Sequence, residues 1–289
     1  MEATRLSIVL FPSDFFNSSA VDTDFESEYM AVQKNPNLTS LVFGYEAWFD
    51  QGRVIISGDL PKLATKAVYR GWMMRPEKYA QFYDALKEKN IMLTTGPEEY
   101  ERIHVFPNAY PYVKEDSARI LCFKLHESIR ISEVLKEFPR FMVKDFVKSV
   151  KGTDFPKFFD SSFSQEDFEH WMEVFYKYRG DLLTGGICIK EYLELKKYDG
   201  KTNEYRAFYA NHEMISLEPN SGQGPFAPTP PEQMLKKYQT LESPFYTVDY
   251  AELADGSWKV IETGDGSVSG LSDRQDATAF FRALYLAFS

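Results

Sequence analysis

Cysteine and histidine are scarce in this chain of 289 residues, and neither type has the spacing that metal ligands usually have. The two cysteines, Cys122 and Cys188, lie far apart in the sequence, which favours reduced thiols in a core over a disulfide framework or a zinc site. The four histidines form no cluster: they are His104, His126, His170 and His212. These absences exclude a zinc-finger-like domain and a disulfide-stabilised secreted scaffold.

Long apolar runs and an excess of basic residues are also missing. The longest early apolar run, Leu6–Phe11, is too short for a signal peptide or a membrane helix, so we predict a cytoplasmic protein with no membrane partner. Lys and Arg number 33 against 43 Asp and Glu, which gives a net charge of −10. A chain with this charge repels a nucleic-acid backbone, so we expect no nucleic-acid partner, while a local basic site for phosphate stays open.

Apolar and aromatic residues are plentiful by contrast. They make up 44% of the chain, with 24 Phe and 18 Tyr, enough for one large core or two to three smaller lobes. Leu6–Phe11 and Asn90–Pro97 are predicted strands, and a helix begins between them at Pro76. Its buried positions recur at helical spacing: Tyr79, Phe82, Tyr83 and Leu86. The pattern predicts an α/β domain over residues 1–115 that ends after a Pro- and Tyr-rich connection, Phe106–Val113.

Two further lobes are predicted over residues 116–193 and 194–289. The first holds a short strand that runs into the loop "KSVKG" at 148–152, and a helix that Ser164 and Asp167 cap and Gly180 ends. The second is rich in strand patterns and closes with a helix over 274–288. Within the second lobe, Asn220–Gln233 is predicted to be a surface loop that leads into a short helix, with low-complexity disorder as the alternative.

Two acidic residues are predicted to face each other in the last hairpin. Asp255-Gly256 is a strong two-residue turn signal; if Ala254 then faces Ser257, Asp249 lies directly opposite Glu262. The same counting places six other residues on this nearly apolar face: Phe245, Thr247, Ala251, Leu253, Trp258 and Val260.

Like charges on a covered face are costly unless a cation or a shared proton relieves them. A divalent metal is the simplest relief, and Mg²⁺ prefers one or two carboxylates together with phosphate oxygens and water. The alternatives are a register that slips by one residue and an Asp249 that is exposed at a strand end.

The run "FYTVDYAELADGSWKVIETGDG" resembles the closing hairpin of ATP-grasp enzymes, in which an Asp and a Glu hold magnesium under the ATP phosphates. Three upstream segments follow in the order of that fold: "FMVKDFVKSVKG", "ICIKEYLEL" and "EYRAFYANHEMI". Together with "YRGWMMRP" and "ETGDGSVSGL", they look most like the third family of the clade named for two arginines and a lysine. The resemblance implies an α/β (α+β) ATP-grasp fold with a preceding Rossmann-like domain, and ATP and Mg²⁺ as cofactors.

The chain departs from the usual ATP-grasp pattern at two places. The glycine-rich phosphate loop is reduced to "KSVKG", and Gly264 stands where an Asn usually follows the metal-binding Glu. Asp265, one position later, is our candidate for the third metal ligand. We expect the flanking glycines to adopt positive φ and to turn its carboxylate beside Glu262.

The resemblance also assigns roles to cationic residues. Lys144 is expected to contact the α- or β-phosphate, with a solvated strand face as the alternative, and Lys148 and Lys151 are candidates for the γ-phosphate. Arg206 is expected to stabilise the transferring phosphoryl group, with a structural ion pair to Glu204 as the alternative. Substrate candidates are Arg70, as a carboxylate clamp, and Arg102, as a second phosphate cation.

The segment "ICIKEYLEL", residues 187–195, looks like the hinge strand of that fold and is the expected adenine site. Its backbone would meet the adenine edge, with Ile189 and Leu193 as apolar walls and Glu194 at the ribose, and an ordinary buried strand is the alternative. The nucleotide-binding candidates of this segment are Lys190, Glu191, Tyr192, Leu193 and Glu194.

The resemblance implies an ATP-dependent ligase that joins a small-molecule or peptide carboxylate to an amine through an acyl phosphate and releases ADP. Lys144 and Arg206 are the catalytic candidates. The alternatives are a phosphotransferase or nucleic-acid end-modifying enzyme on the same fold, and a non-catalytic nucleotide-binding module. The sequence does not indicate the substrates or the oligomeric state.

Overall fold

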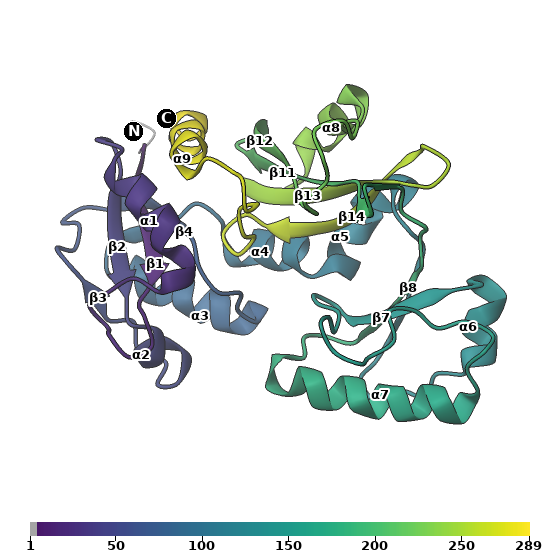
Figure 1. Cartoon of the computed structure of the whole chain (residues 1–289). Coiled ribbons are helices and arrows are strands. Elements are labelled where there is room, and N and C mark those ends of the chain that lie inside the picture. The colour runs from purple at the N-terminus through teal and green to yellow at the C-terminus, as the bar shows by residue number, and fades with distance from the viewer. Residues whose placement is uncertain (1–4) are drawn as a thin grey trace.

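The computed structural model describes residues 5–289, and its N-terminal domain is built on a five-stranded sheet (Figure 1). The strand order is β3-β2-β1-β4-β5, and only β3 runs antiparallel to its neighbour. The strands are β1 (Leu6–Pro12), β2 (Thr39–Phe43), β3 (Ile56–Ser57), β4 (Thr65–Tyr69) and β5 (Ile91–Leu93). The helices are η1 (Thr23–Phe25), α1 (Glu26–Gln33), α2 (Tyr45–Phe49) and α3 (Pro76–Lys87). The predicted α/β start is confirmed; α3 begins at Pro76 and buries Tyr79, Phe82 and Leu86, while Tyr83 is only half-buried.

Helices α4 (Pro97–His104) and α5 (Phe106–Val113) follow, and the short η2 (Lys114–Asp116) ends the segment. The prediction that 106–113 is a connection is therefore wrong: Pro107 lies in the first turn of α5, where a missing N–H is tolerated, and the short helix continues through a second proline, Pro111. Both helices pack on the four-stranded sheet of the C-terminal part of the chain, called the large lobe below, through residues such as Ile103, Phe106 and Val113 (Figure 1). The predicted boundary at residue 115 thus follows two helices that share a core with the large lobe.

The small lobe is a three-stranded antiparallel sheet, in the order β6-β8-β7, covered on one face by two helices. It consists of β6 (Ile120–Phe123), α6 (Ile131–Glu137), β7 (Phe141–Asp145), α7 (Gln165–Arg179), η3 (Gly180–Leu182) and β8 (Ile187–Glu191). The predicted capping pair is confirmed, since Ser164 and Asp167 form a reciprocal capping box at the start of α7. Residues alternate across a strand, so the helix-covered face holds Val143 and Ile189 while the opposite face holds Lys144 and Lys190.

The large lobe is an antiparallel sheet in the order β12-β11-β13-β14. Its strands are β11 (Glu204–Ala210), β12 (Glu213–Pro219), β13 (Phe245–Glu252) and β14 (Trp258–Asp265), after the short pair β9 (Lys197–Tyr198) and β10 (Lys201–Thr202). The predicted loop after β12 leads into α8 (Glu232–Lys237) and η4 (Tyr238–Thr240). It is anchored by Gln223, which is 2% exposed and donates to Asn203 at 3.3 Å.

The C-terminal helix α9 (Ala277–Ala287) joins the large lobe to the N-terminal domain (Figure 1). Phe280, Phe281 and Leu284 lie in one core with Val9 of β1 and Phe208 of β11. Within residues 5–289, no helix combines the length and apolarity needed to cross a bilayer.

The final hairpin turns one residue earlier than predicted. Leu253, rather than Ala254, pairs with Ser257 through an N–H to O hydrogen bond of 2.7 Å, and Gly256 closes the turn at φ +86°. An extra residue, Ile261, forms a bulge in β14 and restores the predicted register beyond it, so Asp249 pairs with Glu262.

The bulge also changes which residues share a face. Trp258 and Val260 pair with Glu252 and Tyr250, and they pack in the core on the α4–α5 side of the sheet. The prediction that these two residues share the face of the acid pair is wrong, because an extra residue exchanges the two faces of a strand.

Candidate active site

Asp249 of β13 and Glu262 of β14 line one small cavity of about 70 Å³. They are direct cross-strand partners, and Arg206 of β11 is the partner of Asp249 on its other side. Both alternatives, a register that slips by one residue and an Asp249 that is exposed at a strand end, are wrong. The two acids are direct partners, and the side chain of Asp249 is only 16% exposed and lies inside its strand. Three adjacent strands thus place two acids and one cation in a row.

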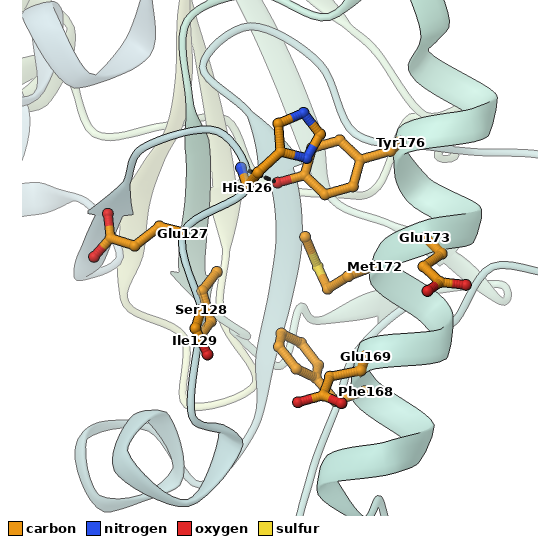
Figure 2. Close-up of a pocket in the computed structure, with 9 residues that line it drawn as sticks. All are labelled: His126, Glu127, Ser128, Ile129, Phe168, Glu169, Met172, Glu173 and Tyr176. Carbon is orange, nitrogen blue, oxygen red and sulfur yellow. Dashed lines mark hydrogen bonds between the residues drawn. The ribbon is translucent and has the colours of Figure 1, made fainter.

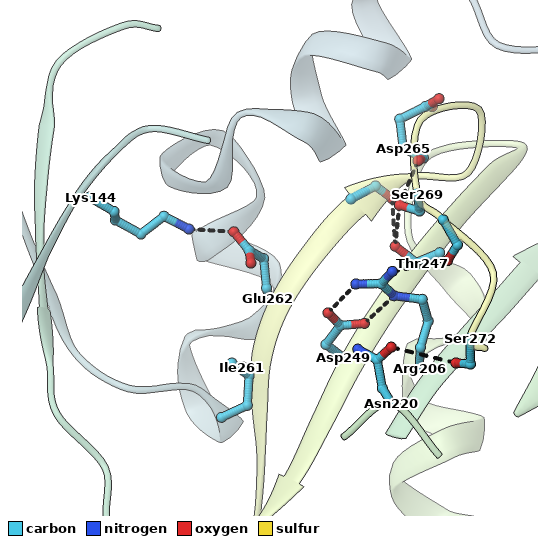
Figure 3. A network of polar contacts seen from close by, with 12 residues as sticks. Lys144, Arg206, Asn220, Thr247, Asp249, Ile261, Glu262, Asp265, Ser269 and Ser272 are labelled. Carbon is cyan, nitrogen blue, oxygen red and sulfur yellow. Dashed lines mark hydrogen bonds and ion pairs between the residues drawn. The ribbon is translucent and has the colours of Figure 1, made fainter. Parts of the chain in front are cut away.

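Each acid is already paired with a cation in this structure (Figure 3). Arg206 holds Asp249 with two hydrogen bonds, from Nε to Oδ1 at 2.8 Å and from Nη2 to Oδ2 at 2.7 Å. Lys144 of β7 reaches across from the small lobe to Glu262 Oε1. The expected ion pair between Arg206 and Glu204 is not formed; Glu204 accepts from Thr202 instead.

These pairs set the protonation states of the site. Burial alone would raise the pKa of Glu262, but the charges of Lys144 and Lys190 outweigh it and lower that pKa to about 2. Burial would lower the pKa of Lys144, and the charge of Glu262 reverses this and raises it. Glu262 is therefore an anion, and Lys144 a cation, over the ordinary pH range. The alternative of a solvated Lys144 is wrong, since the residue is 5% exposed.

Lys190 is a second buried cation on the same face of the small lobe. Its amine donates to the carbonyl of Ile261, the bulge residue of β14, and lies 4.3 Å from the ring centre of Phe106. Burial and the neighbouring charge of Lys144 lower the pKa of Lys190 to about 8. The bulge therefore offers a carbonyl to the small lobe at the point where the two lobes meet.

The loop lysines differ in their relation to the cavity. Lys148 lines it, next to Val147. Although Lys148 is exposed as a residue, desolvation by nearby protein atoms lowers the pKa of its amine, and the charges of Arg206 and Lys144 act in the same direction. Lys151 is exposed and is not among the residues that line the cavity.

The hinge segment lies at the end of β8. The N–H groups of Glu191 and Tyr192 already donate to carbonyls of Arg119 and Arg140, at 2.9 and 3.0 Å. Among residues 5–289 the N–H groups of Leu193 and Glu194 donate to no backbone carbonyl outside the helices and strands, so both are hinge donors available to a ligand.

The hinge side chains make contacts within the small lobe. Glu191 pairs with Arg119 at 3.1 Å, and Glu194 pairs with Arg140 at 2.9 Å. Arg140 also lies 5.0 Å from the ring centre of Tyr192. Ile189, predicted to be an apolar wall of the nucleotide site, is buried in the α6–α7 core on the other face.

Asp265 is not brought to the acid pair. Strand β14 continues through Asp265, three positions after Glu262, so the two side chains point to opposite faces. The expected positive φ is found at neither Gly264 nor Gly266. These glycines instead permit close packing: a Cβ on Gly264 would lie 2.9 Å from Ser269 Oγ, and one on Gly266 would lie 2.6 Å from the Phe245 ring.

The two predicted substrate arginines are also engaged with protein groups. Arg70, 1% exposed, donates from Nε and Nη2 to Glu28 at 2.7 and 2.8 Å and from Nη1 to the carbonyls of Gly266 and Ser269. Arg102 donates to the carbonyl of Glu242 at 2.9 Å and is not among the residues that line the acid-pair cavity. Arg70 therefore positions the loop after β14.

His104 lines the acid-pair cavity and was missed by the sequence analysis. Thr263 donates to the carbonyl of Ile103 at 3.1 Å, which fixes the end of α4 beside β14. Burial lowers the pKa of His104 to about 3, and Lys148 and Lys144 contribute to the shift, so the ring is neutral. A lone histidine at a helix end carried no pattern that would have identified it.

A separate cavity of about 360 Å³ lies on the small lobe between α7 and the loop after β6 (Figure 2). The ring of His126 stacks on Tyr176 with 4.5 Å between centres, and the backbone N–H of His126 donates to the Tyr176 hydroxyl at 2.9 Å. None of the predicted site residues lines this cavity.

The residues at the acid pair fit a magnesium ion that arrives with a nucleotide. Among residues 5–289, no group of three or more His, Cys, Asp or Glu is arranged to hold a metal. Two carboxylates beside Lys144, Lys148 and Arg206 are instead the donor set that Mg²⁺ and a polyphosphate require together.

Solved structures with the same fold are ATP-grasp ligases. The ligase PsnB, complexed with a phosphomimetic variant of its minimal precursor, Mg and ADP, matches with a TM-score of 0.61 and 10% identity, covering 99% of both chains. The D-cycloserine synthetase DcsG matches with a TM-score of 0.62 and 14% identity over 98% of this chain and 100% of its own. The D-alanine-D-alanine ligase of Coxiella burnetii matches with a TM-score of 0.64 and 8% identity over 99% and 94%.

At these identities the likeness concerns the fold, and it confirms the predicted α/β ATP-grasp architecture. No curated protein sequence matches the chain. Residues 132–284 match the family model for the ATP-grasp domain of the third family in the clade named for two arginines and a lysine, and the chain therefore belongs to that family.

Proposed function

We propose that the protein is an ATP-dependent carboxylate–amine ligase that works through an acyl phosphate and releases ADP. The observation that carries this proposal is the cross-strand pair of Asp249 and Glu262, flanked by Arg206 and Lys144 in one cavity. The family assignment and the fold support an ATP site at this place.

Asp249 and Glu262 are the residues that would hold Mg²⁺. The ion, when bound, neutralises phosphate charge and orients the transferred group. Arg206 and Lys144 now occupy the two carboxylates, and each is long enough to pair instead with a phosphate oxygen. Their exchange of partners would couple nucleotide binding to contact between the two lobes.

The nucleotide base is assigned to the cleft face of the small-lobe sheet, beside the hinge. The free N–H of Leu193 would donate to the adenine edge. The triphosphate would then extend past Lys144 and Lys190 toward Lys148, and Glu194 stays the candidate for the ribose.

The chemistry needs no protein nucleophile. A carboxylate oxygen of the substrate attacks the γ-phosphorus, the bond to the β-phosphate oxygen breaks, and ADP leaves. The neutral amine nitrogen then attacks the acyl carbon, the bond from that carbon to the phosphate oxygen breaks, and the nitrogen releases one proton to solvent as phosphate departs. Arg206 and Lys148 would stabilise charge on the transferring group, and neutral His104 would line the site without adding a charge.

Calorimetry tests the nucleotide site. ATP should bind only weakly without Mg²⁺ and tightly with it, and Glu262→Gln and Asp249→Asn should each reduce the Mg²⁺-dependent affinity by tenfold or more. Glu213→Gln, at an exposed position of the same sheet, is the matched control and should bind as the wild type does. Affinity that is indifferent to Mg²⁺ and to both variants would remove the metal-pair assignment.

Hydroxylamine tests the reaction class, because it traps acyl phosphates as hydroxamates. Hydroxamate that forms only with ATP, Mg²⁺ and a carboxylate from a substrate panel would establish the first step. ATP binding without any ADP release across the panel would favour the non-catalytic module. Phosphoryl transfer to an alcohol or a nucleic-acid end would favour the phosphotransferase.

A further inference from the structure

The loop after β7, residues 146–152, carries Lys148 to the acid-pair cavity, and it begins with a tight turn. Lys148 lines the cavity together with Val147, which is 5% exposed. The Asp145 N–H donates to the Lys148 carbonyl at 2.9 Å, and Lys144 and Ser149 form an antiparallel bridge. The chain therefore reverses its direction directly after β7.

Asp145, the last residue of β7, holds this turn through its side chain. It is fully buried, and its Oδ1 accepts the backbone N–H groups of Val147 and Lys148 at 2.7 and 2.6 Å. Its Oδ2 accepts from Nε of Arg179 at 2.8 Å and from the Thr184 N–H at 3.3 Å. One carboxylate thus binds the loop to the last residue of α7 and to the segment before β8.

Phe146 fixes the loop from two further sides. Its N–H donates to the Thr184 carbonyl at 3.2 Å, and its carbonyl accepts from the N–H of Phe106, the first residue of α5, at 2.8 Å. Gly185 leaves room for the Phe146 ring, since a Cβ at that position would overlap the ring. The loop is therefore bound both to the small lobe and to a helix that packs on the large lobe.

These contacts occupy backbone N–H groups that a phosphate would otherwise use. Glycine-rich phosphate loops hold phosphate oxygens with free N–H groups. Here the N–H groups of Phe146, Val147 and Lys148 already donate to protein oxygens, and Gly152, the one glycine in "KSVKG", is exposed. Taking them from Asp145 would leave a buried carboxylate with fewer partners, which is costly. The Lys148 amine, in contrast, carries a charge that suits phosphate.

We propose that Asp145 is a positioning residue that holds the loop after β7 as a fixed turn, and that the Lys148 side chain, instead of the loop backbone, binds the γ-phosphate. The inference rests on the proposed ligase function and specifies how its nucleotide site binds the terminal phosphate. Asp145 does not line the cavity, so it acts through Lys148. Nucleotide binding then needs no closure of this loop, and selectivity for ATP over ADP depends on Lys148.

Hydrogen exchange of the wild type tests the fixed turn without any substitution. The N–H groups of Val147 and Lys148 should be protected in the free protein. Saturation with Mg²⁺ and a non-hydrolysable ATP analogue should change their exchange rates by less than about threefold. A loop that closes as a lid would exchange fast when free and at least tenfold more slowly when bound, and this result would overturn the proposal.

Calorimetry with the ATP analogue and with ADP, each with Mg²⁺, tests the phosphate contact. Lys148→Met should weaken the analogue tenfold or more and leave ADP within about twofold of the wild type, because only the analogue has a third phosphate. Lys157→Met, at an exposed position farther along the same segment, is the matched control and should bind both nucleotides as the wild type does. Equal losses for the two nucleotides, or no loss for either, would overturn the assignment of Lys148.

Asp145 variants distinguish a positioning role from a purely structural one. Asp145→Ala should weaken the ATP analogue selectively, and it should add no further loss to Lys148→Met, since it acts through that lysine. Asp145→Asn keeps an oxygen for the two N–H groups and should restore most of the affinity. Asp160→Ala is the matched control, because Asp160 also accepts an N–H two residues on, from Ser162 at 2.9 Å, and lies outside the cavity. Parallel losses for ADP would contradict positioning.

The wild-type titration separates this inference from the proposed function. If Asp145→Ala does not fold, the wild-type exchange rates and the selectivity of Lys148→Met decide the question. If the wild type binds the ATP analogue with Mg²⁺ and Lys148→Met binds it equally well, the inference fails and the ligase proposal stands. If the wild type binds no nucleotide, the proposed function fails, and the inference fails with it.

Discussion

Asp265 is a buried carboxylate that forms no ion pair with any of residues 5–289. Its Oδ1 accepts the Ser267 N–H at 2.8 Å, while its Oδ2 and the nearby Thr95 hydroxyl are buried and make no hydrogen bond in the described chain. Burial raises the pKa of Asp265 to about 7, against the opposing effects of its hydrogen bonds and Arg70. Between pH 4 and 7 the folded protein therefore binds a proton here that the unfolded chain releases.

Asp265→Asn should remove this pH dependence. Because the folded-state pKa is raised, the wild type loses stability as pH rises from about 4 to 7, and the neutral amide does not. The variant should gain on the order of 2–4 kcal/mol in the free energy of unfolding at pH 8, because folding raises the pKa of Asp265 to about 7, and its amide could also reach Thr95. Urea unfolding at pH 5 and pH 8 measures this, with exposed Asp59→Asn as the control. A variant that loses stability at pH 8 would contradict the assignment.

Gly266 is required by close packing rather than by φ. A Cβ there would lie 2.6 Å from the ring of Phe245, which is fully buried, so Gly266→Ala should destabilise the fold by about 1–3 kcal/mol. Gly270→Ala is the matched control, because a Cβ at Gly270 meets nothing within 4 Å, and it should stay within about 0.5 kcal/mol of the wild type. Thermal unfolding of the two variants distinguishes them, and equal midpoints would contradict the packing argument.

At the scale of elements, the acid pair was predictable and the route to it was not. The turn signal at Asp255-Gly256 located the hairpin, and counting placed Asp249 opposite Glu262. The structure reaches the same pairing through a three-residue turn and a compensating bulge at Ile261. The bulge is contacted from outside its own sheet, since Lys190 of the small lobe donates to the Ile261 carbonyl, and such a contact between lobes is not visible in local sequence.

Cys122 and Cys188 are likewise brought together in a way that local sequence does not predict. They are distant in sequence, yet they are direct cross-strand partners on β6 and β8. Cys122 is exposed, so the prediction of two core thiols is half wrong, while both thiols are free as expected. A hydrogen bond between the sulfurs lowers the pKa of Cys122 and, together with burial, raises that of Cys188.

Mild oxidation tests this register. Diamide should convert the pair to an intramolecular disulfide, because cross-strand neighbours lie near the separation that a disulfide needs. Thiol titration should fall from two free thiols to none in the monomer, with the intact mass lowered by two hydrogens. Cys122→Ser should retain its single thiol. Persistence of both thiols, or cross-linked dimers alone, would contradict the β6–β8 pairing.

At the scale of the whole molecule, the three lobes meet at the candidate site. The small lobe contributes Lys144 and Lys190, and the large lobe contributes the acids that Lys144 and Arg206 pair with. The order of the motifs along the sequence predicted that Lys144, Arg206 and the two acids lie near one another, because each motif lies on a strand with a recognisable sequence pattern. Motif order could not predict that Arg70 binds protein groups instead of a substrate. Its partners, Glu28 and the loop after β14, are brought together only by the tertiary fold.

Arg70 links the first and last parts of the chain. Arg70→Met should destabilise the protein by about 3–5 kcal/mol, because it leaves Glu28, which is 5% exposed, buried without a counter-charge. The double variant Arg70→Met with Glu28→Leu should cost clearly less than the sum of the two single variants, since no charge is then left unpaired. Urea unfolding of all four proteins gives the coupling.

Hydrogen exchange then distinguishes the loss of the hydrogen bonds from Arg70 to the loop after β14 from the effect of leaving the Glu28 charge unpaired. In both Arg70 variants the backbone N–H of Gly71, which donates to the Ser267 carbonyl, should exchange faster, because the loop loses its hydrogen bonds from Arg70. Additive stabilities, together with unchanged Gly71 exchange, would show that the N-terminal domain and the loop after β14 are held by the shared core of α9 alone.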